Sequence, residues 1–157
     1  MSGEGAPQIA VDGSGMSIVI VASMWHTQVM DGLIAGATTT CDVAGATYEL
    51  VRVAGSFELP VVAKAAAVAG ADAVIALGVI IRGGTPHFDY VCAAATDGLS
   101  SVALDTGVPV GFGLLTCDDE GQALDRAGLP GSRESKGREA AEAAISTVHA
   151  LRALKSH

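Results

Sequence analysis

The chain has 157 residues, half of them hydrophobic but only 4% aromatic, and 17 acidic against nine basic residues give a formal net charge of -8. This length suits one domain with a sizeable core, and an acidic surface repels phosphate backbones, which argues against nucleic acid as a partner. Because the first 15 residues lack a signal-peptide pattern and the longest apolar run is too short to span a bilayer, we expect a soluble, cytoplasmic protein.

The N-terminal part is polar and glycine-rich, with a small apolar island at residues 8–11. We predict that residues 1–15 form a flexible arm, disordered at its very start, in which the island can become a short strand. Such a strand could pair with the sheet edge of another subunit. Residues 16–157 show no shift in composition, so they are predicted to form a single domain.

The first half of that domain alternates strand and helix patterns. Residues 16–22 and 47–53 are predicted strands, separated by a helix over residues 28–42 whose apolar positions recur at helical spacing. An alanine-rich helix then begins near Pro60, a residue suited to a first helical turn, and it ends at Gly70.

The third predicted strand, residues 73–81, is apolar on both faces, which is typical of a central strand in a parallel sheet covered on both sides. The next helix is predicted to start at Pro86. The face that it buries is expected to carry Val91, Ala94, Ala95, Leu99 and Val102.

The last unit contains a strand over residues 109–115 and a short helix with Asp119 as its N-cap and Gln122 as the reciprocal partner. A loop over residues 128–135 precedes a final helix with a continuous apolar stripe. Four strand–helix units predict a three-layer α/β/α sandwich around a four-stranded parallel sheet.

Ligands of parallel sheets bind beyond the carboxyl ends of the strands, and these ends are polar here. The only tryptophan, Trp25, follows the first strand, where it either stacks on a flat heterocycle or caps the sheet. Ser56 and Glu58 flank Phe57 after the second strand. Glu58 either caps the next helix or accepts hydrogen bonds from a ligand.

After the third strand, residues 83–85 (GGT) can present backbone N–H groups to an anion. His87 either shuttles protons beside that anion or simply satisfies a helix N-terminus. Arg126 and Lys136 border the loop of the last unit, and either could supply fixed positive charge, although each alone also fits a solvated surface position.

Motifs for dinucleotides and nucleoside triphosphates are absent, and no His, Cys or carboxylate cluster has metal-ligand spacing, so no cofactor or metal is expected. The cysteines, Cys41, Cys92 and Cys117, fit buried thiols in a reducing compartment. The residue pattern therefore predicts a cofactor-free enzyme or binder for a phosphate and a planar ring, without naming a reaction.

Four segments together resemble the lumazine synthase family: GSFELPVVAK (55–64), ALGVIIRGGTPHFDYVC (76–92), PVGFGLLTCDDEGQALDRAG (109–128) and SKGREAAEAA (135–144). The resemblance runs from the first strand to the last helix. It implies a flavodoxin-like fold and a transferase of riboflavin biosynthesis. Such an enzyme condenses 5-amino-6-(D-ribitylamino)uracil with 3,4-dihydroxy-2-butanone 4-phosphate to give 6,7-dimethyl-8-ribityllumazine, water and phosphate.

The same resemblance implies roles for individual residues. His87 would be the proton donor and acceptor, and Gly84, Thr85 and Arg126 would bind the phosphate. Trp25 would stack on the pyrimidine. The ring and its ribityl chain would be bound by Ser56, Phe57, Glu58, Val79, Ile80, Ile81, Phe112 and Lys136.

In this family the sites lie between subunits, so the resemblance implies that Phe112, Arg126 and Lys136 come from the adjacent chain. The loop over residues 129–135 looks longer than the tight turn of shell-forming members. We therefore expect a free homopentamer, with an icosahedral shell of pentamers as the alternative.

Two other classes of function compete with the enzyme. A non-catalytic binder of a flavin or lumazine would keep the ring-lining residues but would not need His87 and Arg126 together. A purely structural assembly protein would lose the polar strand ends. The presence of both His87 and Arg126 in this sequence favours the enzyme.

Overall fold

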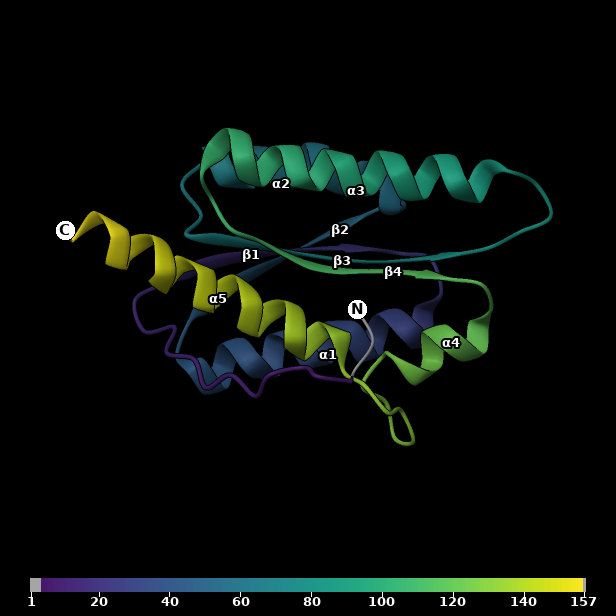
Figure 1. Cartoon of the computed structure of the whole chain (residues 1–157), viewed down its shortest axis with the longest axis horizontal. Helices are drawn as coiled ribbons and strands as arrows, with labels where there is room; N and C mark the ends of the chain where they lie inside the picture. Colours follow the sequence, from purple (N-terminus) through teal and green to yellow (C-terminus); the bar gives the residue numbers. More distant parts are fainter. Residues whose placement is uncertain (1–3, 157) are drawn as a thin grey trace.

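A parallel sheet of four strands, in the order β2-β1-β3-β4, forms the middle layer of the computed structural model, which describes residues 4–156 (Figure 1). The strands are β1 (Ser17–Ser23), β2 (Thr47–Val53), β3 (Ala73–Ile81) and β4 (Val110–Cys117). β3 pairs with β1 on one side and with β4 on the other. The predicted four-stranded parallel sheet is confirmed.

Helices cover both faces of this sheet, as Figure 1 shows. On one face lie α2 (Leu59–Val68) and α3 (His87–Thr106), and on the other lie α1 (Thr27–Ala44) and α5 (Lys136–Lys155). Two short elements complete the chain, η1 (Ser56–Glu58) and α4 (Glu120–Asp125). The arrangement is the predicted three-layer α/β/α sandwich, consistent with a flavodoxin-like fold.

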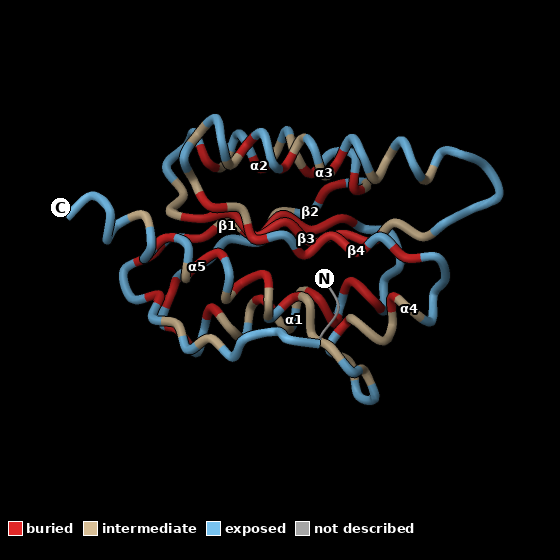
Figure 2. The backbone as a smooth tube through the Cα atoms, viewed as in Figure 1, coloured by how far each residue is buried: buried red, intermediate tan, exposed pale blue. Residues whose placement is uncertain are grey.

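The central strand β3 has an apolar sequence because both of its faces are buried. Ile75 and Leu77 belong to the core between the sheet and α1 and α5, whereas Val74 and Ala76 belong to the core beneath α2 and α3. Every residue from 73 to 79 is buried, which Figure 2 shows as the red centre of the sheet. Full burial of each large aliphatic side chain contributes about 1.5–3 kcal/mol, so this strand holds both layers together.

The start of α5 is fixed against α1 by a close backbone approach. Gly137 lies so near the Leu33 carbonyl that an added Cβ would overlap the oxygen. Only glycine permits this contact. It determines where the preceding loop and Lys136 are held.

Three local predictions need correction. Ala94 is exposed on the outer side of α3, although its spacing placed it on the buried face. β4 continues to Cys117 because Thr116 and Cys117 still pair with β3. Asp119 does cap α4 by accepting the Gln122 N–H at 2.8 Å, but the Gln122 side chain accepts from the Asp118 N–H at 2.7 Å and not from Asp119.

Within the described part of the N-terminal arm, Asp12 and Gly13 contact the layer formed by α1 and α5. Residues 8–11 form no strand within the chain itself, so their pairing with another subunit stays a prediction. The Gly13 N–H donates to the Ala44 carbonyl at 2.8 Å, and a ring nitrogen of His149 contacts the Asp12 carbonyl. The expected disorder at the start of the chain concerns residues 1–3, which lie outside the described range. Within residues 4–156, no helix is both long and apolar enough to span a membrane.

Candidate active site

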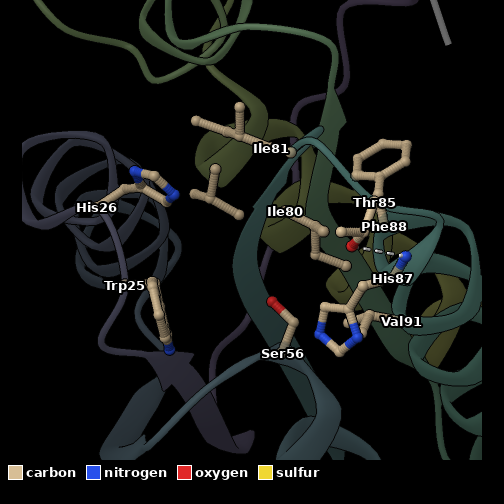
Figure 3. A pocket seen from close by; sticks show the side chains of 11 residues that line it. Trp25, His26, Ser56, Ile80, Ile81, Thr85, His87, Phe88 and Val91 are labelled. Atoms are coloured by element: carbon tan, nitrogen blue, oxygen red, sulfur yellow. Dashed lines mark hydrogen bonds between the residues drawn. The ribbon is translucent and has the colours of Figure 1, made fainter.

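A pocket of about 240 Å³ opens beyond the carboxyl ends of β1 and β3 (Figure 3). The chain leaves these two adjacent strands toward opposite edges of the sheet, which is the place where α/β folds bind ligands. The residues that line the pocket are Trp25, His26, Ser56, Val79, Ile80, Ile81, Gly83, Thr85, His87, Phe88 and Val91. Seven of the predicted site residues are thereby brought together: Trp25, Ser56, Val79, Ile80, Ile81, Thr85 and His87.

Ser56 provides a polar group at the floor of the pocket. The residue is only 7% exposed, and its Oγ has no hydrogen-bond partner within residues 4–156. Gly78 makes room for it, since a Cβ there would lie 2.7 Å from this oxygen. A buried hydroxyl without a partner is costly, and Figure 3 shows it pointing into the pocket, where a ligand could pair with it.

The loop after β3 presents open backbone to the same space. A Cβ at Gly83 or Gly84 would meet no atom within 4 Å. The loop leads into the N-terminus of α3, a helix of 20 residues whose dipole favours an anion. The His87 N–H donates to the Thr85 Oγ1 at 3.4 Å, which joins the loop to the first helical turn (Figure 3).

Arg82 supports this loop from outside. Its Nε donates to the Asp118 Oδ1 at 2.9 Å, its Nη1 lies 3.6 Å from Asp89, and its guanidinium stacks on the Phe88 ring at 4.4 Å. The hydrogen bond to Asp118 raises the pKa of Arg82 further above its usual range. Arg82 therefore ties the end of β4 to the start of α3, on both flanks of the glycine loop.

Two rings, Trp25 and His26, form the wall opposite His87 (Figure 3). Trp25 is 66% exposed, so it is not a packing residue that caps the sheet within this chain. The Trp25 and His26 ring centroids are 6.4 Å apart. His26 was not among the predicted site residues, although an imidazole directly after the tryptophan at a strand end was a usable signal.

Six predicted site residues do not line the pocket: Phe57, Glu58, Gly84, Phe112, Arg126 and Lys136. The Glu58 carboxylate accepts the Gly55 N–H at 3.0 Å, which is the capping role. Phe57 and Phe112 expose 65% and 46% of their surface. Within the described chain, these six residues, among them both predicted cations, therefore lie outside the pocket lining.

Arg126 and Lys136 instead form a cluster with Glu134 and Glu139 in the segment between α4 and α5. The Arg126 Nε and the Lys136 Nζ each lie 3.7 Å from the Glu134 Oε2, and the Lys136 Nζ also lies 3.0 Å from Glu139. The Arg126 Nη1 donates to the Gln122 carbonyl at 2.9 Å. We call these four residues the charged cluster.

The cysteines are unsuited to nucleophilic chemistry at neutral pH. Burial raises the pKa of Cys41 to about 11, and burial likewise raises the pKa of Cys92 and Cys117. A thiol reacts as its thiolate, so all three stay largely unreactive. Residues 4–156 also contain no group of three or more His, Cys, Asp or Glu side chains that could hold a metal ion.

Comparison with known proteins gives one consistent family. A family model described as 6,7-dimethyl-8-ribityllumazine synthase matches residues 15–152. Proteins of that name from Leifsonia xyli and Clavibacter sepedonicus are 67% and 62% identical, over 99% of this chain and 99% of their own. The one from Streptomyces coelicolor is 57% identical over 98% of this chain and 97% of its own. The resemblance seen in the sequence segments is confirmed.

Proposed function

This chain belongs to the 6,7-dimethyl-8-ribityllumazine synthase family, and we propose that its pocket beyond β1 and β3 is where it carries out the family's reaction. The protein is a transferase of riboflavin biosynthesis. It condenses 5-amino-6-(D-ribitylamino)uracil with 3,4-dihydroxy-2-butanone 4-phosphate into 6,7-dimethyl-8-ribityllumazine, water and phosphate. One observation carries the assignment of the site: an imidazole, an open glycine loop and an unpaired hydroxyl meet in a single pocket.

The glycine loop is the proposed phosphate site. Backbone N–H groups of residues 83–85, the Thr85 hydroxyl and the N-terminus of α3 all favour an anion at this end of the pocket. Gly84 does not line the pocket of the lone chain, but its open surroundings leave room for a phosphate oxygen to approach. Arg126 of an adjacent chain would add the fixed positive charge.

His87 is the proposed proton carrier. The ring amine of the uracil attacks the ketone carbon, and water leaves as the C=N bond forms. Phosphate then departs, and the ribitylamino nitrogen closes the second ring with loss of water. Each of these steps moves a proton, and His87 lies beside the loop where the phosphate departs. A positioned imidazole contributes roughly 10²–10⁴-fold to such steps, and holding two substrates together contributes further.

The opposite end of the pocket is the proposed ring site. Trp25 would stack on the pyrimidine, the backbone of residues 79–81 would line its edge, and the Ser56 hydroxyl would pair with a polar group of the ring. We assign Phe57 and Glu58, on the same short helix η1, to the ribityl chain. Phe112 and Lys136 of the adjacent chain would close the site over the ring.

We also propose that the protein is a homopentamer with its sites between subunits, the alternative being an icosahedral shell of pentamers. Large apolar side chains lie exposed on the outer layer of α2 and α3, which is a pattern typical of interfaces. They are Val61, Val68, Tyr90 and Leu104, each at least 69% exposed. In such an assembly, residues 8–11 of the proposed N-terminal arm could pair with a neighbour's sheet edge. We place the protein in the cytoplasm.

Light scattering tests the assembly. A pentamer has five times the 15.6 kDa mass of one chain. A particle in the megadalton range would contradict the free pentamer and support the shell.

The test of the function is to mix the purified protein with both substrates and to follow lumazine fluorescence together with phosphate release. Omission of the butanone phosphate is the control for each signal. A non-catalytic carrier would bind the lumazine without forming it. That outcome would favour a non-catalytic lumazine binder over the enzyme.

A further inference from the structure

His26 has the most unusual backbone in the described chain. Its φ of 58° and ψ of 68° make it the only non-glycine residue within residues 4–156 with a positive φ. This left-handed region is costly for residues with a Cβ, although histidine is among the types that tolerate it best. Strained residues of this kind gather at functional sites.

The fold requires this backbone but not this side chain. The His26 carbonyl accepts the Met30 N–H at 2.9 Å and so begins α1, whereas the His26 side chain makes no capping hydrogen bond. A glycine would adopt the same conformation without strain. The imidazole must therefore be explained by something other than the start of the helix.

The ring lies in the pocket with its polar atoms free. It is exposed, it stands tilted by 46° to the Trp25 ring, and it makes no hydrogen bond or ion pair with any described residue. In Figure 3 it stands on the wall opposite His87 and Thr85. The buried, unpaired Ser56 Oγ points into the same space, which independently indicates a polar ligand there.

We propose that His26 is a substrate-binding residue that recognises the polar edge of the aminouracil ring. The inference rests on the proposed function, which places the phosphate at the loop of residues 83–85 and the ring beside Trp25. A uracil edge alternates carbonyl acceptors with N–H donors. A neutral imidazole has one donor and one acceptor, so either tautomer can pair with that edge.

The experiment compares three forms of the enzyme, wild type, His26→Gly and His26→Asn, and measures KM for each substrate. Glycine keeps the backbone conformation and removes the ring, so the KM for the aminouracil should rise roughly three- to tenfold, the value of one neutral hydrogen bond. The KM for the butanone phosphate should change less than about twofold, and the melting temperature should not fall. Asparagine tolerates the same backbone and keeps a short donor and acceptor, so its effect should be smaller than that of glycine.

A binding measurement separates recognition from catalysis. Trp25 is the only tryptophan, so quenching of its fluorescence by added 6,7-dimethyl-8-ribityllumazine reports on this wall alone. Weaker quenching in His26→Gly at unchanged melting temperature supports the proposal. An unchanged KM for the aminouracil, or an equal rise of both KM values with a lower melting temperature, overturns it. If wild-type protein forms no lumazine, the proposed function itself fails, which is a different result.

Discussion

The pocket contains seven of the predicted site residues and the charged cluster contains two, Arg126 and Lys136, and the two regions treat their polar groups differently. In the pocket, the Ser56 hydroxyl is buried without a partner, and the His26 ring makes no polar contact within the described chain. In the charged cluster, Arg126 and Lys136 both lie within salt-bridge distance of Glu134. The pocket is open toward a ligand, whereas the charged cluster sets cations against carboxylates of the same chain, in which the Glu134 Oε2 and the Glu139 Oε2 have ion-pair contacts but no hydrogen-bond partner within residues 4–156.

This difference has a physical reason. An unpaired hydroxyl costs about 1–3 kcal/mol, which a folded protein can tolerate at one position, whereas two unpaired and partly buried cations would cost far more. Carboxylates of the same chain therefore hold the cations in place. The contrast teaches that one chain can leave a hydroxyl open in a pocket while it holds its partly buried cations against carboxylates elsewhere.

The largest effect is expected from a substitution in the pocket. His87→Ala should lower turnover by roughly 10²-fold, because proton transfer loses its positioned group. The rate of lumazine formation with both substrates saturating measures this. His149→Ala is the matched control, since that imidazole contacts the Asp12 carbonyl of the N-terminal arm. A wild-type rate in His87→Ala would remove His87 from the mechanism.

The next largest effect is expected from a substitution in the charged cluster. Arg126→Ala should raise the KM for the butanone phosphate by roughly tenfold or more, since a charge-assisted hydrogen bond contributes about 1.5–3 kcal/mol. The KM for the aminouracil should stay nearly unchanged. Arg133→Ala serves as control, because that side chain is 84% exposed and pairs with Asp125 at the surface, where a salt bridge contributes little. Equal effects of the two substitutions would argue against an interfacial role for Arg126.

A smaller effect tests the glycine loop. Gly84→Ala should leave the free energy of unfolding within about 0.5 kcal/mol, since the new methyl group meets no atom within 4 Å. It should nevertheless raise the KM for the butanone phosphate severalfold by obstructing the phosphate. Gly78→Ala is the contrasting variant, because its Cβ would lie 2.7 Å from the Ser56 Oγ and should lower stability. A Gly84→Ala enzyme with normal kinetics would place the phosphate elsewhere.

The smallest effect is expected from a substitution that tests the difference between the pocket and the charged cluster directly. Ser56→Ala removes the unpaired hydroxyl, so the free enzyme should gain up to about 1 kcal/mol of stability in urea unfolding. The KM for the aminouracil should rise by roughly threefold at the same time. A loss of stability would show that the hydroxyl is satisfied in the free protein, and the contrast with the charged cluster would then disappear.

Local sequence signals predicted most of the elements because they depend on neighbours along the chain. β3 begins and ends where its apolar run does, since helices cover both of its faces. The N-cap at Asp119 was readable for the same reason. Ala94 was placed wrongly because residues 93–95 are all alanine, so helical spacing does not show which of them faces the sheet, and it is Ala95 that is buried.

Part of the site could be predicted from the rule that ligands of parallel sheets bind beyond the carboxyl ends of the strands. That rule selected Trp25, Ser56, Thr85 and His87, which line the pocket, and also Glu58 and Gly84, which do not. His26 follows Trp25 at the same strand end and was not selected; its left-handed backbone, which only the structure shows, is what distinguishes it from its neighbours.

The sequence by itself determined the α/β/α fold, the family and the residue types available for the reaction, because periodicity, chain breakers and motifs are local properties. Only the tertiary structure decided which of those residues share a pocket. Arg126 and Lys136 are held beside Glu134, away from the pocket of their own chain, because Gly137 fixes the start of α5 against α1. Packing between elements distant in the chain sets that separation, and no spacing along the sequence encodes it.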